Sequence, residues 1–300
     1  DSAAYILYAR RNRYLTQAGT LQLGQMRYFP CKCSNCANTS PEEVRSRSVT
    51  ERVRFLAEHN LTVCMQEVDT IKEAIVEGRL WELVELRSRS HPSLLEALRR
   101  LGKHKLHLAS AAPSTKRRGI LFFDPTSLHR PEYTTQIERI LHQYTSPREA
   151  RIALLMPQTH HRSEYAGKAP DTNTSKTERG IHVCLYSPPY GLIPSELENS
   201  FPFSQTETQE DPDPGTLKAM SESVQAYLAK NRNYKMLIFL HSGKKWQVRL
   251  MRMCKRACNR TKTRFHSYAS ERIPRGRIEI LGRRTNQVRA LYKRRRVRRA

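Results

Sequence analysis

Acidic residues, long apolar runs and paired cysteines are all scarce in this sequence. The 300 residues include 28 Asp and Glu against 53 Lys and Arg, which gives a formal net charge of +25. This surplus indicates a polyanionic partner, because each Lys or Arg that neutralises a phosphate releases condensed counterions. The alternative is a basic, solvated surface that binds no partner.

No apolar run approaches the length needed to span a membrane, and no signal-peptide pattern is recognised, so we expect no membrane partner. Three of the seven cysteines are clustered, which is not the pattern of a disulfide framework and favours a reducing cytoplasm. No internal repeat is visible. Because the chain begins with Asp1 and not with Met, we interpret it as part of a longer protein.

The most informative motif is the Cys-x-Cys-x-x-Cys cluster formed by Cys31, Cys33 and Cys36. Three thiolates this close in sequence can bind one cation with little loop-closure cost, and a histidine from a following helix would complete a tetrahedral Cys₃His shell. Such a shell is typical of structural Zn²⁺, and it leaves no open position for water or substrate. The alternative is three unpaired buried thiols.

We predict that His59 is the fourth ligand. Ser48 and Glu51 have the spacing of a capping box, and a shorter helix can begin after Ser40, so the helix from Ser48 would carry His59 back towards the thiolates. An ordinary histidine near a helix end is the alternative interpretation. The competing ligands are Cys64, His91, His104 and His107.

The sequence divides into three regions. Residues 1–104 contain the metal motif and helical patterns, in which apolar residues such as Ile71, Ile75 and Leu94 are expected to form core. Residues 105–270 are predicted to form a small α/β domain with a largely parallel sheet, because short branched apolar runs alternate with helical patterns. The predicted strands are 120–123, 152–156, 181–186 and 236–240, and the predicted helices are 134–144, 217–230 and 246–258. Residues 271–300 form a basic tail, either solvated or contacting phosphates.

Residues 1–10 (DSAAYILYAR), residues 13–20 and the metal motif with its preceding Tyr-Phe-Pro closely resemble the archaeal branch of the tRNA-guanine transglycosylases. The segment 59–61 (HNL) resembles the zinc-histidine segment of that family. Residues 130–132 and 186–198 are similar to the C-terminal extension of the archaeal enzymes. The resemblance runs to about Gln205 and is most specific at the metal motif.

The resemblance implies an α/β fold class: a C-terminal remnant of a TIM-barrel catalytic domain with a zinc-binding subdomain, followed by a small α/β accessory domain. It also implies a homodimer to which the zinc subdomain contributes. Asp1 matches the family's nucleophile, which attacks the ribose anomeric carbon and expels guanine. An incoming 7-deazaguanine base (preQ0 in archaea) then displaces the aspartate from the covalent intermediate, in archaeosine biosynthesis.

The nucleophile position is followed by Arg10, Arg11 and Arg13, which could contact phosphates beside a flipped-out nucleotide of tRNA; surface charge is the alternative. The barrel strands that precede Asp1 in the family are missing, and no PUA domain is recognised. We therefore expect the chain alone not to catalyse exchange.

Two other functions are considered. An archaeosine synthase-like paralogue carries a Cys-Lys signature, which residues 156–165 lack. A non-catalytic, zinc-stapled tRNA-binding or dimerisation subunit would retain the metal site and the basic surface only.

Overall fold

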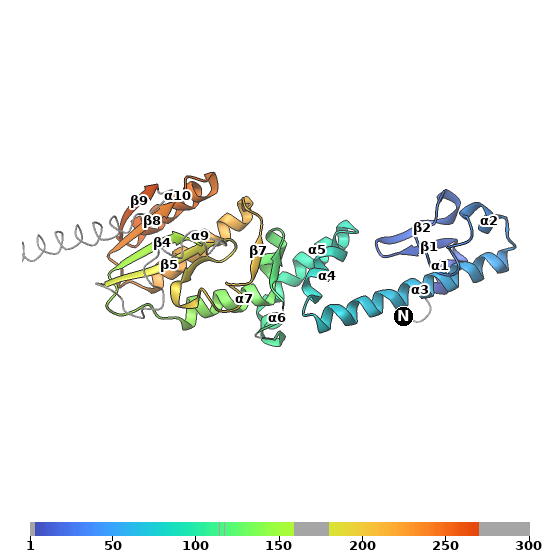
Figure 1. Cartoon of the computed structure of the whole chain (residues 1–300), viewed down its shortest axis with the longest axis horizontal. Helices are drawn as coiled ribbons and strands as arrows, with labels where there is room; N and C mark the ends of the chain where they lie inside the picture. Colours follow the sequence, from blue (N-terminus) through green and yellow to red (C-terminus); the bar gives the residue numbers. More distant parts are fainter. Residues whose placement is uncertain (1–3, 114, 117, 159–179, 270–300) are drawn as a thin grey trace, which may run out of the picture. The chain divides into compact units, whose positions relative to one another are not determined.

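The computed structural model divides the chain into two compact units (Figure 1). The first comprises residues 1–105 and 116–118, and the second comprises residues 106–115 and 119–300. The structure describes residues 4–113, 115–116, 118–158 and 180–269. The predictions for Asp1, for the tail 271–300 and for most of the 156–165 stretch therefore concern segments outside the described residues.

The first unit begins with α1 (Ala4–Arg10) and an antiparallel hairpin of β1 (Arg13–Thr16) and β2 (Gly19–Gln22). A short 3₁₀ turn, η1 (Leu23–Gln25), leads into the cysteine loop. The helices that follow are α2 (Pro41–Ser46), α3 (Val49–Val76), α4 (Leu80–Ser88) and α5 (Pro92–Leu101), then η2 (Gly102–His104). The next helix, α6 (Lys105–Ala111), belongs to the second unit from residue 106 on.

Two capping boxes set the starts of α2 and α3; the sequence predicts the one at α3, and at α2 it predicts only the start of a helix after Ser40. At α3, Ser48 Oγ accepts the backbone N–H of Glu51 at 3.4 Å, and the Glu51 carboxylate accepts the backbone N–H of Ser48 at 3.1 Å. Ser40 and Glu43 make the same reciprocal pair at α2. Each pair satisfies helix N–H groups that have no partner within the helix. The turn between the two helices is thereby fixed, and α3 runs back past the cysteine loop.

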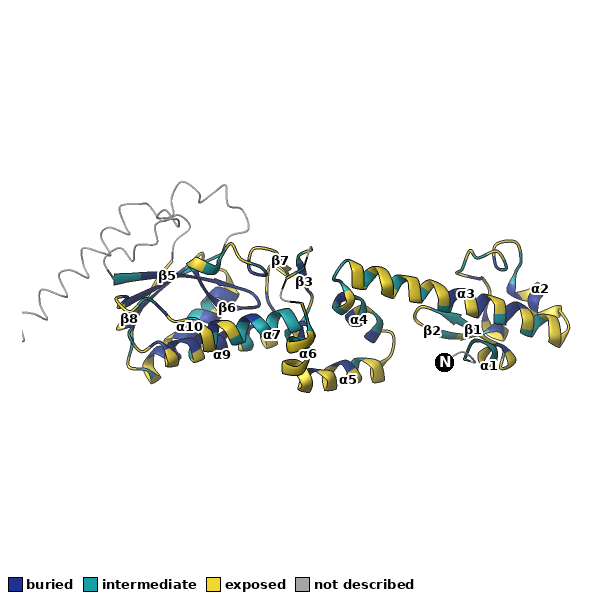
Figure 2. Ribbon diagram, turned by 90° about the horizontal axis from the view of Figure 1, so that it is seen from below, coloured by how far each residue is buried: buried dark blue, intermediate teal, exposed yellow. Residues whose placement is uncertain are grey.

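The core of the first unit lies where α1, the hairpin and the start of α3 meet. Tyr14, Leu23, Phe29 and Leu56 are buried there beside the cysteine loop. The second half of α3 differs from this, because Ile71 is 38% exposed and Ile75 57% exposed (Figure 2). Leu94 on α5 is also exposed. The expectation that the apolar stripe forms core is therefore wrong for Ile71, Ile75 and Leu94, whereas Leu98 on α5 is buried as expected.

The second unit is a mixed α/β structure, as predicted. Its five-stranded sheet has the order β6-β5-β4-β8-β9; strands β5, β4, β8 and β9 are labelled in Figure 1. The parallel strands are β4 (Ile152–Pro157), β5 (Ile181–Ser187), β8 (Met236–His241) and β9 (Arg264–Ala269), and β6 (Gly191–Pro194) is an antiparallel edge. A separate parallel pair joins β3 (Ile120–Phe122) to β7 (Thr206–Thr208).

Helices α7 (Pro131–Glu138), α9 (Pro214–Lys230) and α10 (Lys245–Arg260) accompany this sheet, with the short turns η3 (Pro125–His129), η4 (Arg139–Gln143) and η6 (Ser195–Leu197). Residues of α9 and α10 share one core with the sheet, in which Tyr186 stacks on Phe239 with ring centroids 4.6 Å apart and meets Trp246 edge-on. The alternate strand residues Leu154 and Ile238 are buried on the other face. Apolar residues on both faces are typical of parallel strands.

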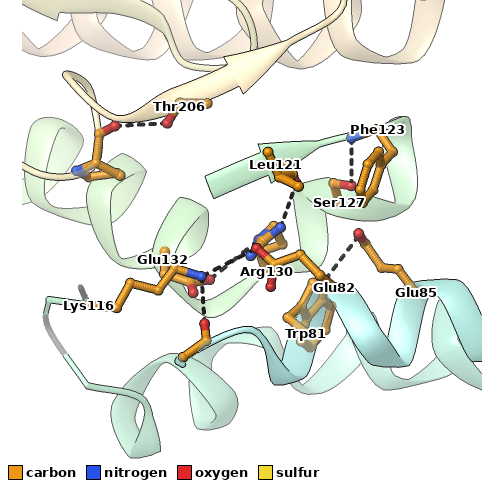
Figure 3. Close-up of polar contacts among 12 residues, drawn as sticks. Trp81, Glu82, Glu85, Lys116, Leu121, Phe123, Ser127, Arg130, Glu132 and Thr206 are labelled. Carbon is orange, nitrogen blue, oxygen red and sulfur yellow. Dashed lines mark hydrogen bonds and ion pairs between the residues drawn. The ribbon is translucent and has the colours of Figure 1, made fainter. Parts of the chain in front are cut away.

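Arg130 is a fully buried arginine of the second unit. Its guanidinium donates to the carbonyl of Leu121 at 2.6 Å and lies 3.5 Å from the Glu132 carboxylate (Figure 3). A buried arginine is stable only when it is paired and hydrogen-bonded. Residues 130–132, which carry part of the family resemblance, thus hold β3 to the start of α7.

Within the described residues, the structure contains no helix with the length and apolar character needed to cross a membrane.

Replacing Gly191 with Ala is expected to destabilise the second unit by about 2–4 kcal/mol. Gly191 has φ +79°, and an added Cβ would lie 2.7 Å from the carbonyl oxygen of Met220 on α9. Gly243 is a matched control, because it has φ +88° but no atom within 4 Å of an added Cβ. We expect Gly243→Ala to lower the free energy of unfolding by only about 1 kcal/mol, the cost of holding an alanine in the left-handed backbone conformation. Thermal unfolding measures both changes, and equal losses would contradict the packing argument.

Candidate metal centre

The structure brings Cys31, Cys33, Cys36 and His59 together in the first unit. One ligand atom from each lies within 4.8 Å of all the others, and no second group of this kind occurs among the described residues. Three ligands come from the loop between η1 and α2, and the fourth comes from the third turn of α3. The four residues named from the sequence are therefore close enough to bind one cation.

The distances within the group suit tetrahedral zinc. His59 Nδ1 lies 3.6 Å from Cys33 Sγ and 3.5 Å from Cys36 Sγ. Zn–S bonds of about 2.3 Å and a Zn–N bond of about 2.0–2.1 Å, joined at the tetrahedral angle, separate S from N by about 3.6 Å. The donor set and these two distances thus fit a Cys₃His metal site.

The orientation of His59 also suits a ligand. Its Nε2 lies 2.9 Å from the carbonyl oxygen of Leu15, so Nε2 carries the proton and donates it there. The lone pair of Nδ1 then faces the thiols, which is the tautomer that a metal requires. The Tyr14 ring stacks on the imidazole with centroids 3.8 Å apart, and burial lowers the pKa of His59, which keeps it neutral.

The thiols differ in their surroundings when no cation is bound. Burial raises the pKa of Cys36 to about 12, and the neighbouring thiols Cys33 and Cys31 add to this effect. Burial would also raise the pKa of Cys33, but hydrogen bonds led by that from the Cys36 backbone N–H lower it overall. The Tyr14 hydroxyl lies 3.5 Å from Cys36 Sγ. A cation would favour the thiolate form of all three cysteines.

Asn60 is a functional residue that the sequence alone does not reveal. It is fully buried beside His59, and its side chain makes three hydrogen bonds to backbone groups. Its Oδ1 accepts the N–H of Leu15 at 2.8 Å, and its Nδ2 donates to the carbonyls of Tyr5 and Arg13, both at 3.1 Å. Asn60 thus ties α1 and β1 to α3. The partners lie 45–55 positions away, so no local pattern predicts them.

The other ligand candidates lie outside the metal group. Cys64 is half-buried further along α3, and His91 caps α5 by accepting the N–H of Ser93 at 3.2 Å. His104 and His107 lie in η2 and α6. None of these residues replaces His59 in the site.

The arginines predicted to contact RNA lie around the turn between α1 and β1. Arg10, Arg11 and Arg13 are exposed, and none of them forms an ion pair with an acidic residue that the structure describes. The turn is held by Asn12, whose φ is +54° and whose side chain accepts from Arg52 Nε at 3.0 Å. Asn60 fixes the carbonyl of Arg13. The three side chains are therefore displayed by a well-anchored turn.

Comparison with known proteins shows what this chain is similar to. Residues 1–93 match the model of the family described as queuine tRNA-ribosyltransferase. The tRNA-guanine(15) transglycosylase of Archaeoglobus fulgidus is 34% identical over 256 residues, which are 84% of this chain and 48% of that protein. The protein of the same name from Methanococcus maripaludis strain C5 is 38% identical over 213 residues, 69% of this chain and 31% of that protein.

A third relative, the tRNA-guanine(15) transglycosylase of Saccharolobus solfataricus, is 32% identical over 246 residues, 81% of this chain and 48% of that protein. The chain thus spans about half or less of the length of these curated relatives. The resemblance seen in the sequence is confirmed: along most of its length this chain is similar to archaeal tRNA-guanine transglycosylases.

Proposed function

We propose that this chain is the part of a tRNA-guanine transglycosylase that carries the nucleophile and the structural metal site. The reaction is the exchange of guanine in tRNA for a 7-deazaguanine base, preQ0, on the route to archaeosine. One observation carries the proposal: the region that matches the family also holds the converged Cys₃His group. Relatives named tRNA-guanine(15) transglycosylase support tRNA as the substrate.

In the proposed mechanism, the Asp1 carboxylate attacks the ribose anomeric carbon as the bond to guanine breaks. The departing base takes up a proton, and an aspartyl–nucleotide ester remains. Deprotonated preQ0 then attacks the same carbon and releases the aspartate, so two inversions retain the configuration. Because a base within a stack cannot be reached, the target nucleotide is flipped out, and Arg10, Arg11 and Arg13 hold its flanking phosphates.

Zinc has an architectural role in this proposal. When bound, it supplies four bonds that join the cysteine loop to α3, and a full shell of protein ligands leaves no position for substrate. His59 donates to Leu15, and the adjacent Asn60 binds the carbonyl of Tyr5 in α1. The site thereby anchors the helix that begins three residues after Asp1.

Exposed apolar residues on α3 support the proposal that the first unit is part of a larger barrel. Leu61, Met65, Val68 and Ile75 follow one another at spacings of four, three and seven residues, and they are 42%, 53%, 42% and 57% exposed. A stripe of this kind on a monomeric surface marks a contact site. We propose that it packs against the remainder of a TIM barrel, of which residues 1–104 are the C-terminal remnant with the zinc subdomain.

In the same proposal, residues 105–270 form the accessory α/β domain and residues 271–300 the basic tail. The assembled enzyme is a homodimer. Its location is the cytoplasm, where the thiols stay reduced and tRNA is present.

An exchange assay tests the function. The natural protein that contains this chain is incubated with tRNA carrying labelled guanine, together with unlabelled preQ0. We expect release of the label, and we expect Asp1→Asn to lower the rate by at least about 10⁴-fold, because the amide is a poor nucleophile. If tRNA binds but no label is released, the transglycosylase proposal is wrong. The alternative of a non-catalytic tRNA-binding subunit, favoured by the basic surface, predicts that result.

A further inference from the structure

The outward face of α10 in the second unit is unusually basic. The helix contains no Asp or Glu, and its N-terminal residue has no side-chain cap. Its exposed basic residues are Lys245, Arg249, Arg252, Lys255, Arg256 and Arg260. Five of these six, all but Lys255, are spaced four, three, four and four positions apart, which places them in one stripe along the helix. This stripe is called the α10 basic face below.

Neighbouring like charges on a helix repel each other, and helices elsewhere in the chain relieve this with acidic partners. Lys72 pairs with Asp69 on α3, Arg100 pairs with Glu96 on α5, and Lys218 lies near Glu222 on α9. On the α10 basic face, no ion pair to a described acidic residue is formed, and Arg260 donates to the neutral side chain of Gln225. The positive charges of this face are therefore available to bind an external anion.

The first turn of α10 gives a second argument. Cations are disfavoured at a helix N-terminus, where the backbone N–H groups already make a positive pole. Lys244 and Lys245 nevertheless lie there, directly after the left-handed Gly243 at φ +88°. Lys244 reaches Glu210 at 2.5 Å, whereas Lys245 is exposed with no acidic partner among the described residues. Lys245 thus carries a positive charge where the helix dipole disfavours one.

The opposite side of α10 fixes the helix and decides which kind of anion fits. Trp246, Leu250, Cys254 and Cys258 are buried in the core shared with the sheet and α9. A helix that binds a membrane surface must insert its apolar side into the lipid, and here that side is already occupied. The basic side chains are instead held on a rigid helix, with the arginines about 4.5–6 Å apart along its axis over a length of about 17 Å. This is the spacing of a backbone of successive phosphates, which guanidinium groups bind in bidentate fashion.

We propose that the α10 basic face is a binding surface for the phosphate backbone of tRNA, separate from Arg10, Arg11 and Arg13 of the first unit. The choice of tRNA as the ligand rests on the proposed function. That the α10 basic face binds an anion is argued only from the charge of its side chains and the packing of the helix. Because phosphates carry no sequence information, this surface adds affinity and orientation and does not choose the base.

The test compares two triple variants of the full chain. Arg249→Gln/Arg252→Gln/Arg256→Gln neutralises the α10 basic face. Lys72→Gln/Arg100→Gln/Lys218→Gln removes the same net charge from exposed, ion-paired positions elsewhere. Both sets are exposed, so thermal unfolding checks that each variant is folded. Binding of labelled tRNA is then measured between 50 and 300 mM KCl.

We expect the α10 variant to lose at least about tenfold in affinity at low salt, and its plot of log K against log salt to become shallower by about 2–3, since each lost phosphate contact removes about 0.7–0.9. The control variant should keep the wild-type slope. Equal behaviour of the two variants overturns the inference. The inference is also overturned if the α10 variant loses binding to phosphatidylserine vesicles but keeps its binding to tRNA. If the exchange assay fails but the α10 variant still shows the weaker salt dependence of tRNA binding, the proposed function is refuted. The α10 basic face would then still be a tRNA-binding surface.

Discussion

Replacing Cys33 with Ser is expected to remove the metal and to unfold the part of the first unit around the cysteine loop. The serine hydroxyl nearly preserves the volume but is a poor zinc ligand, and metal binding to such sites is coupled to folding. We expect metal content to fall from about one ion per chain to background. The unfolding midpoint of the first unit should fall by about 15 °C or more, since 1 kcal/mol corresponds to roughly 4–8 °C in a domain of about 100 residues.

Cys64→Ser is the matched control for this variant. Cys64 is a half-buried thiol on α3, as Cys33 is in the loop, but it lies outside the metal group. Metal content by mass spectrometry and thermal unfolding should therefore stay close to wild type. If Cys33→Ser keeps a full equivalent of metal, or if both variants lose the same stability, the Cys₃His assignment is wrong.

Replacing Asn60 with Ala is expected to cost about 3–5 kcal/mol of unfolding free energy. The change strips hydrogen bonds from the N–H of Leu15 and from the carbonyls of Tyr5 and Arg13, and each buried group left without a partner costs about 1–3 kcal/mol. Asn60→Asp should be worse despite its equal size, because a carboxylate cannot donate to the two carbonyls and is costly to bury.

Asn38 is exposed in the cysteine loop and supplies the control, since Asn38→Ala should change stability by less than about 0.5 kcal/mol. Chemical denaturation of the metal-loaded chain measures all three variants. Because Asn60 ties α1 to α3, we also expect Asn60→Ala to lower exchange activity of the natural protein at temperatures where it is still folded. An Asn60→Ala variant as stable as wild type would refute the role of Asn60 as the tie between these elements.

The features that the sequence predicts well are those set by local spacing. Cys31, Cys33 and Cys36 are close in sequence, and the capping box at Ser48 fixes the helix that carries His59, so the metal group follows from two short patterns. The buried strands are likewise recognisable, because β4, β5 and β8 are short branched apolar runs.

The features that depend on long-range contacts could not be predicted. The hydrogen bonds of Asn60 join segments far apart in the chain, and β9 is a mostly exposed strand without an apolar run. Helical spacing also cannot tell whether an apolar stripe is covered, so the spacing predicts Ile75 in the core although its side chain is exposed. The α10 basic face becomes visible only once the packing of Trp246 and Leu250 shows which side of the helix faces outwards.

We propose that Asp1 of this chain is the nucleophile of a transglycosylase. The most direct test is to incubate the natural protein with tRNA in the absence of an incoming base, denature the mixture and look for a protein–tRNA adduct on a gel. We predict a shifted band that Asp1→Asn abolishes, with the nucleotide ester mapped by mass spectrometry to the peptide that contains Asp1. An adduct mapped to another residue, or exchange activity that survives Asp1→Asn, would contradict the claim.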